Sequence, residues 1–308
     1  MSQASFATTS SATVPDPGIE NATPQGDAAH PGLQEMIIEP VDGWAPVDFK
    51  ELLRYRELLY FLVWRDVKVR YKQTVLGVAW AILVPLFSMA IFTVIFGNFA
   101  GLKDTLPEGL RNAYPVYVYA GLLPWLFFSN AVSLGGMSLV NQQQLLTKIY
   151  FPRLFVPTAT VGGALVDMGL SAVIFSVLMA SYGVVPSIQI ALVPLMVVLT
   201  CVASLGVAYM LSALTVSYRD FRFVIPFMVQ AWQFLSPVVY PASIVPERYQ
   251  LLYAINPMVG PIEGIRAMVF GSAIPWGMIA VSTLSSLLLF GSGLMIFRRI
   301  EARFADIA

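Results

Sequence analysis

Long apolar runs alternate with short charged connectors along most of this chain. A helix needs about 20 apolar residues to cross a hydrocarbon core of about 30 Å. Six runs meet this requirement, and we expect each to form a transmembrane helix. They cover residues 75–99, 115–138, 157–182, 190–216, 223–240 and 274–297, within a transmembrane domain at 75–303. The predicted fold class is therefore all-α, a polytopic membrane protein.

The segment before the first span has a helical composition but is too charged to cross a membrane. On a helical wheel, Arg65 and Lys68 fall on one side, whereas Leu59 and Val63 lie opposite. We expect residues 46–74 to form an amphipathic helix in the plane of the interface. Its apolar side would enter the lipid boundary, and its basic side would meet phosphates or an acidic partner protein. The alternative is a basic flank that only fixes the topology.

The Lys and Arg residues predict the orientation of the spans. They cluster before the first span, in the connectors at 148–153 and 219–222, and after the last span at 298–303. Positive charge beside a spanning helix stays on the cytoplasmic side of the membrane. We therefore expect both termini to be cytoplasmic. Five or seven spans would place the terminal arginines on the opposite face.

Composition excludes several classes of function. With 57% hydrophobic and 12% charged residues, the chain is too apolar for a soluble domain of this length. Residues 1–45 are rich in small and polar residues and contain no Lys or Arg, so we expect a disordered cytoplasmic tail without a basic surface for nucleic acid. One histidine, His30, and one cysteine, Cys201, leave no cluster for a metal ion.

Two connectors carry more than a plain loop requires. The segment 141–154, NQQQLLTKIYFPRL, is polar and then basic and aromatic. We expect a short surface helix whose Lys148, Tyr150 and Phe151 protrude into a groove on a soluble partner, or else a simple connector. The second such connector, the segment 242–271, is apolar and contains several prolines.

The apolar segment 242–271 predicts two short helices at 246–254 and 257–270, separated at Asn256 and Pro257. Their apolar faces cannot all meet water. We expect a re-entrant pair of helices that enters the outer leaflet between spans 5 and 6 and sits over an exit. The alternative is a periplasmic cap on the bundle.

Polar side chains inside two of the spans are candidate functional groups. An isolated carboxylate such as Asp167, in the third span, costs at least about 2.5–3.5 kcal/mol at membrane depth. It either lines a lumen or relay, or makes a polar contact between helices. In the fifth span, Phe227, Gln230 and Phe234 share one face with Gln233 beside it. Aromatic faces and amides suit a sugar chain, although such a stripe is also typical of helix packing.

The chain carries no catalytic motif that could supply energy or chemistry. The phosphate-binding pattern GxxxxGK[ST] is absent because no lysine follows a glycine, and there is no HExxH pair. A hydrolase triad cannot be built with His30 as its only histidine. We therefore expect the chain to be no ATPase and no enzyme.

Four motifs in order resemble the membrane subunit of polysaccharide-exporting ABC transporters, a family of O-antigen, capsular polysaccharide and teichoic acid exporters. They are RDVKVRYKQTVLGVAWAILVPL at 65–86, TKIYFPR at 147–153, SPVVYPASIVPERYQLLYAINP at 236–257 and IEGIRAMVFG at 262–271. The resemblance covers residues 45–300 and leaves the N-terminal tail outside.

The resemblance implies a subunit that exports a polyprenyl-pyrophosphate-linked polysaccharide of the O-antigen type across the bacterial inner membrane. It implies a homodimer with two copies of a separate ABC ATPase, which binds ATP and Mg, whereas this chain binds no cofactor. Alternatives within the superfamily are capsular polysaccharide or teichoic acid export, and export of a small lipid or drug. A proton-driven transporter and an intramembrane enzyme acting on a prenyl-linked sugar are the remaining rivals.

The resemblance also places functional residues on this sequence. The ATPase-coupling residues would be Lys148, Ile149, Tyr150, Phe151, Pro152 and Arg153. Arg54, Arg65, Lys68 and Arg70 of the interface helix would be candidates to meet the pyrophosphate, since clustered cations bind it well. The periplasmic gate would contain Tyr249, Tyr253, Asn256, Pro257 and Arg266. The conduit between two copies would be lined by Asp167, Phe227, Gln230, Gln233 and Phe234.

Overall fold

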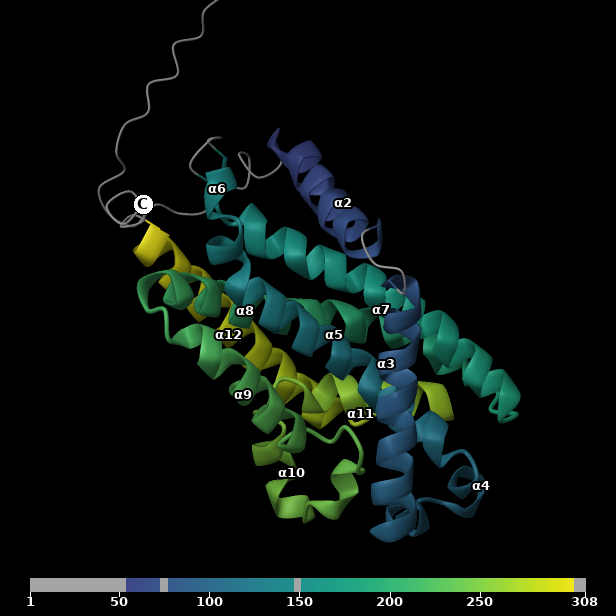
Figure 1. The fold of residues 1–308 in the computed structure, drawn as a ribbon. Coiled ribbons are helices and arrows are strands. Elements are labelled where there is room, and N and C mark those ends of the chain that lie inside the picture. The colour runs from purple at the N-terminus through teal and green to yellow at the C-terminus, as the bar shows by residue number, and fades with distance from the viewer. Residues whose placement is uncertain (1–53, 73–76, 147–150, 302–308) are drawn as a thin grey trace, which may run out of the picture. The chain divides into compact units, whose positions relative to one another are not determined.

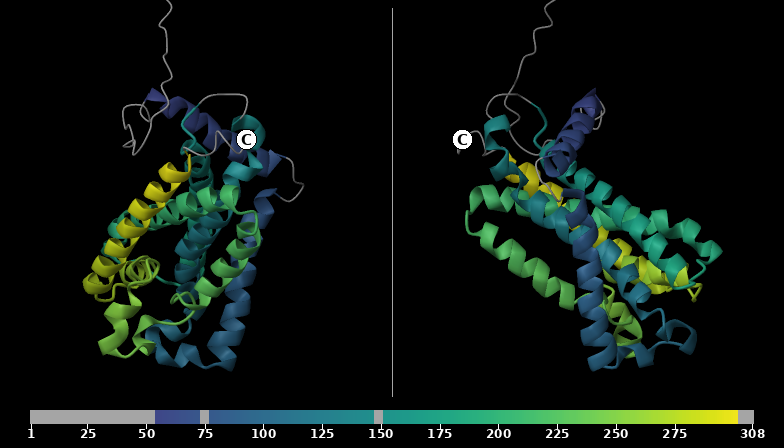
Figure 2. Two further views of the ribbon diagram at one scale, coloured as in Figure 1. Left: turned by 90° about the vertical axis from the view of Figure 1, so that its left-hand side faces the viewer. Right: turned by 45° about the vertical axis from the view of Figure 1, so that its right-hand side comes forward.

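The structure is a computed structural model that describes residues 54–72, 77–146 and 151–301. These residues lie in the second of two units of the chain, residues 43–308. Within the described ranges the secondary structure is helical and contains no strand, and the long helices pack side by side (Figure 1, Figure 2). The expected all-α class is confirmed.

Five helical segments are long and apolar enough to cross a membrane, and they confirm five of the six predicted spans. The first joins α3, Gly77–Phe92, to a π-helical continuation, η1, Thr93–Phe99. The second is α5, Tyr114–Asn141, and the third is α7, Phe155–Ser181. The fourth joins η3, Ile188–Leu192, to α8, Val193–Ser217, and the last is α12, Trp276–Glu301.

Short elements flank these spans at the two ends of the bundle. One end carries α2, Arg56–Lys72, together with α6, Gln143–Leu146, and the C-terminal end of α12 (Figure 1). The other end carries α4 and α10 (Figure 1, Figure 2). We call them the α2 end and the α10 end. The remaining short elements are η2, Leu102–Thr105, α4, Glu108–Arg111, η4, Ala242–Ile244, α10, Glu247–Tyr253, and α11, Val259–Phe270.

Helix α5 is the centre of the bundle. It packs against α7 and α8 along much of its length, and also against α3, α9 and α11. Its side chains Val116, Tyr119, Leu122 and Phe128 are completely buried. Because neighbouring helices surround α5, its apolar side chains contact protein where an outer helix would contact lipid.

Glycines allow α8 and α12 to approach closely. A Cβ atom on Gly293 would lie 2.0 Å from the carbonyl oxygen of Gly206, and one on Gly206 would lie 2.5 Å from the backbone nitrogen of Phe290. Small residues at helix contacts are typical of membrane proteins, in which association depends on close packing because lipid is as apolar as the side chains.

The predicted fifth span differs from its expected form. The region 223–240 was expected to be one continuous helix, but α9, Phe221–Phe234, has 14 residues and is about 21 Å long. The helix stops because Pro237 lacks a backbone N–H and disfavours helical geometry at Ser236. Residues 235–240 continue as irregular chain from α9 toward α10 (Figure 1).

The irregular backbone after α9 is buried and hydrogen-bonded. Arg266 of α11 donates to the carbonyl oxygens of Pro237 at 2.6 Å, Val238 at 2.6 Å and Tyr240 at 3.0 Å. The Tyr114 hydroxyl donates to the carbonyl of Val239 at 3.0 Å. Non-helical backbone at membrane depth is tolerated only where protein or trapped water satisfies it. These donors therefore allow the fifth helix to end early.

We expect Gly293→Ala to destabilise the bundle by about 1–3 kcal/mol, because the added methyl group would push α12 away from α8. The matched control is Gly291→Ala, two residues earlier on α12, where an added Cβ meets nothing within 4 Å. Thermal unfolding of the detergent-solubilised protein measures both variants. Equal melting temperatures for Gly293→Ala and Gly291→Ala would contradict the proposed close contact.

Candidate functional site

Helix α2 lies on α7 at the α2 end of the bundle. Its Leu62 is 2% exposed, and Val63 packs against Gly162 of α7, where a Cβ would lie 2.8 Å from Val63 Cγ2. The apolar side of α2, which was expected to enter lipid, thus packs against α7. The outer surface instead exposes the aromatic residues Tyr60, Phe61 and Trp64.

A polar cluster fastens the C-terminal end of α2 to α7. Arg70 forms an ion pair with Asp167, and the Tyr71 hydroxyl donates a hydrogen bond to the same carboxylate. Burial raises the pKa of the Tyr71 hydroxyl above its ordinary value, and the bond to Asp167 raises it further. Tyr71 therefore remains a protonated donor at neutral pH.

Asp167 does not lie with the other residues predicted to line the conduit. It faces α2 from α7, whereas Phe227 and Gln230 are on α9, which packs against α5 and α8. Figure 1 shows α7 and α9 on different sides of the central helices. The geometry of Asp167 is that of a contact between helices.

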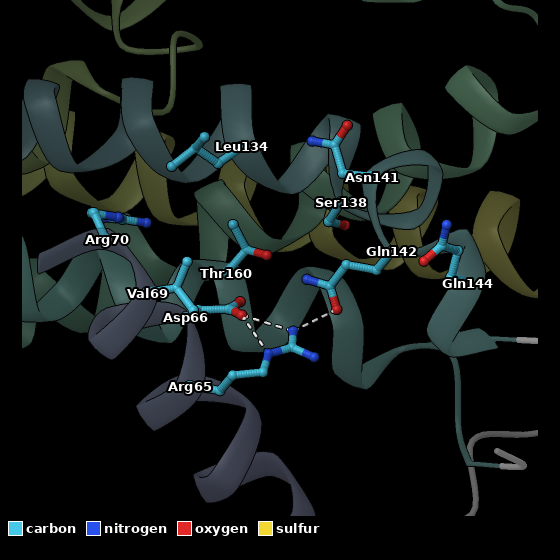
Figure 3. Close-up of a pocket in the computed structure, with 10 residues that line it drawn as sticks. All are labelled: Arg65, Asp66, Val69, Arg70, Leu134, Ser138, Asn141, Gln142, Gln144 and Thr160. Atoms are coloured by element: carbon cyan, nitrogen blue, oxygen red, sulfur yellow. Dashed lines mark hydrogen bonds and ion pairs between the residues drawn. The ribbon is translucent and has the colours of Figure 1, made fainter. Parts of the chain in front are cut away.

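A cavity of about 710 Å³ lies between α2, α5, α6 and α7 (Figure 3). On its α2 side, the Arg65 Nη2 atom is 2.7 Å from Asp66 Oδ1 and donates to Gln142 Oε1 at 2.7 Å. Arg70 also lines the cavity. Of the four cations expected to meet pyrophosphate, Arg65 and Arg70 come together here. Arg54 and Lys68 are exposed and lie outside the lining.

The predicted coupling segment is described only in part. Lys148, Ile149 and Tyr150 lie outside the described residues. Phe151 does not protrude as expected, because it is 5% exposed and belongs to a buried cluster with Phe155 and Phe297.

Two further residues of the coupling segment can be placed. Pro152 is half-buried beside Phe151. The Arg153 guanidinium donates to the carbonyl of Glu301 at 3.4 Å. The C-terminal part of the segment is therefore joined to the end of α12.

The outer face of α9 carries the remaining conduit candidates. Phe227 is 74% exposed and Phe234 is 58% exposed; Gln230 is also exposed, and Gln233 is half-buried. Ile225 and Val229 on the opposite side are buried against the bundle. The aromatic and amide stripe is thus not used for packing within the described part of this chain.

The residues predicted to form the gate separate into exposed and buried groups. Tyr249 is exposed on α10, with the guanidinium of Arg248 4.6 Å from its ring centre. The Tyr253 hydroxyl lies 2.9 Å from that of Tyr240, and burial raises the pKa of Tyr253 above its ordinary value.

Asn256 and Arg266 hold backbone in place. The Asn256 amide nitrogen donates to the carbonyl of Leu235 at 2.9 Å, and its oxygen accepts from the Trp232 indole at 3.0 Å. Pro257 follows and is buried. Arg266, assigned to the outer loop from the sequence, is only 3% exposed. Its position in the interior is explained by the carbonyl groups it binds.

Several residues of these clusters were missed in the sequence. Glu263, 2.9 Å from Arg266, has the i,i+3 spacing of a helical ion pair and could have been found. Asn141 and Gln142 of the cavity belong to a polar run that was predicted as part of a surface helix or connector and not as part of a cavity wall. A metal site has no support, since within the described ranges no three His, Cys, Asp or Glu residues gather.

Comparisons with known proteins agree on one family. The family model described as ABC-2 type transporter matches residues 57–270. The chain is 31% identical over 261 residues to the O-antigen export system permease protein RfbA of Myxococcus xanthus, covering 83% of this chain and 97% of that protein.

More distant relatives have related names. The RfbA protein of Klebsiella pneumoniae is 25% identical over 252 residues, which cover 82% of this chain and 95% of that protein. The polysialic acid transport protein KpsM of Escherichia coli is 25% identical over 249 residues, covering 77% of this chain and 91% of that protein.

We expect Asp167→Asn to loosen α2 from α7 by about 1–2 kcal/mol, because Arg70 would lose its counter-charge. Faster hydrogen exchange of the α2 amides in the purified protein would report this loss. Asp220→Asn, an exposed carboxylate in the turn between α8 and α9, is the control. Unchanged protection of α2 in Asp167→Asn would exclude the cluster as its anchor.

We expect Arg266→Met to cost about 3–5 kcal/mol, because it leaves buried carbonyl groups and Glu263 without their donor. The yield of monodisperse protein on size-exclusion chromatography and the melting temperature should both fall. Arg248→Met, which removes an exposed arginine on α10, should leave both measurements unchanged. A wild-type melting temperature for Arg266→Met would show that the arginine is dispensable.

Proposed function

The chain belongs to the ABC-2 type transporter family of membrane subunits, and from this premise we propose that it exports a polyprenyl-pyrophosphate-linked polysaccharide of the O-antigen type. The observation that carries the proposal is the 31% identity to an O-antigen permease over nearly that protein's whole length. The similarity to a polysialic acid transporter supports capsular polysaccharide as the second candidate substrate.

ATP hydrolysis takes place outside this chain. The family does not carry ATPase activity and implies a nucleotide-binding partner subunit. We propose two copies of this chain and two of the partner, with the segment Lys148–Arg153 as the contact that receives the partner's movement. Phe151 in its buried cluster and Arg153 at the end of α12 provide a rigid base for that contact.

We propose six crossings of a bacterial inner membrane, with the α2 end in the cytoplasm. In this topology α9 and residues 235–240 together make the fifth crossing. Support comes from the charges, because most described Lys and Arg residues lie at the α2 end, where anionic lipid retains them. They are Arg54, Arg56, Arg65, Lys68, Arg70, Lys72, Arg153, Arg219, Arg222, Arg298 and Arg299.

The conduit is proposed to form where two copies face each other along α9. Exposed Phe227, Gln230 and Phe234 would offer ring faces for stacking and an amide for hydrogen bonds to sugar. Helices α10 and α11, proposed to lie at the periplasmic side, would form the gate. Arg54, just before α2, and Lys68 on α2 are both exposed and would meet the phosphates of the carrier at the membrane surface.

Deletion of the gene should remove the surface polysaccharide of its host, and lipid-linked glycan should accumulate inside the cell. Returning the wild-type gene should restore export. Labelling of surface glycan measures this. Gln230→Ala with Phe234→Ala should reduce restored export by about tenfold, because two of the three side chains that meet sugar are lost.

Val177→Ala, an exposed change on α7, is the control and should restore fully. Full surface polysaccharide in the deletion strain would refute polysaccharide export. Full export by the double variant would contradict the proposed sugar-lined path along α9.

A further inference from the structure

The cavity at the α2 end has the volume of a small-molecule site and is largely open to its surroundings. Its volume of about 710 Å³ falls within the range of about 300–1,000 Å³ that is typical of such sites. Four helices contribute to its wall, from parts of the chain that are far apart in sequence (Figure 3). The lining residues are Arg65, Asp66, Val69, Arg70, Leu134, Ser138, Asn141, Gln142, Gln144 and Thr160.

The lining is rich in neutral groups that both donate and accept hydrogen bonds. Amide side chains come from Asn141, Gln142 and Gln144, and hydroxyl groups from Ser138 and Thr160. These two hydroxyls donate to the carbonyl oxygens of Gly135 and Val156 on their own helices, so they offer a ligand their lone pairs. An amide presents a donor and an acceptor in one plane, and a hydroxyl oxygen can still accept while it donates. This chemistry matches a ligand covered with hydroxyl groups.

The charges at the cavity are balanced. Arg65 is paired with Asp66, and Arg70 with Asp167. A diphosphate entering the cavity would have to compete with both carboxylates for the two guanidinium groups. Ion pairs of this kind do, however, hydrogen-bond well to neutral hydroxyls, which need no counter-charge. The balance therefore favours an uncharged polar ligand over an anion.

We infer that this cavity binds uncharged sugar residues of the lipid-linked substrate, those next to the pyrophosphate, before the glycan crosses the membrane. The inference rests on the proposed function and adds to it a recognition site outside the conduit. The pyrophosphate stays with the exposed cations Arg54 and Lys68, outside the lining. A sugar bound here contacts Gln142, which joins α5 to α6 and precedes the segment Lys148–Arg153 that is proposed to receive the partner's movement.

The test measures binding to the chain purified together with its ATPase partner. The probe is the oligosaccharide released from the host's own glycan by mild acid, which carries no phosphate or lipid, titrated in a calorimeter. We expect Asn141→Leu combined with Thr160→Val to weaken binding by about tenfold, the effect of losing two hydrogen-bonding groups.

Controls separate the site from its surroundings. Gln143→Leu removes an exposed amide on α6 that does not line the cavity, and it should bind like the wild type. Asn141→Leu alone, at an exposed position, should also weaken binding and should fold normally. Inorganic pyrophosphate at millimolar concentration should fail to displace the oligosaccharide.

Three results would overturn the inference. They are displacement of the oligosaccharide by pyrophosphate, equal affinity in the Asn141 and Gln143 variants, and no binding to the wild-type complex. These results are separable from the proposed function, which depends on restored export by the wild-type gene. If the wild-type gene restores export but binding is unchanged in the Asn141 variants, only the proposed sugar site is refuted. Failure of the wild-type gene to restore export removes the proposed function itself.

Discussion

The requirement that every buried backbone polar group has a partner governs this structure. Most of the chain meets it with continuous helices, but residues 235–240 do not. There the missing helical bonds are replaced by side-chain donors, above all the Arg266 guanidinium, which spreads its N–H groups over several carbonyl oxygens. A lysine has three donors on one atom and could not reproduce this fan of hydrogen bonds.

This requirement also fixes the neighbours of the broken segment. Arg266 can reach the carbonyls only if α11 lies inside the bundle, and most side chains of α11 are accordingly buried. Gly121 must lack a side chain, because a Cβ there would lie 2.5 Å from the guanidinium and 2.5 Å from the carbonyl oxygen of Val238. Helix α11 is thus buried and stabilises the fold, whereas α10 is exposed and remains accessible.

Much of the architecture follows from local sequence, because a helix that crosses a bilayer must be apolar over its whole length. The length of an apolar run therefore predicts the length of a span. Five spans were predictable in this way, and Pro237 explains the early end of α9 once its missing N–H is considered. Long-range pairs were not predictable. Asp167 could be identified as a costly carboxylate, but nothing local indicates Arg70, 97 residues away, as its partner. Phe151 shows the same limit, since an aromatic residue in a connector can dock on a partner or anchor in the core.

Helix α2 has two very different sides, one fastened to α7 and the other bearing Tyr60, Phe61 and Trp64. Aromatic rings of this kind settle among lipid headgroups, where they fix the depth of a helix. Four lining residues of the cavity, Arg65, Asp66, Val69 and Arg70, belong to α2, so the contacts between α2 and α7 also hold one wall of the cavity in place.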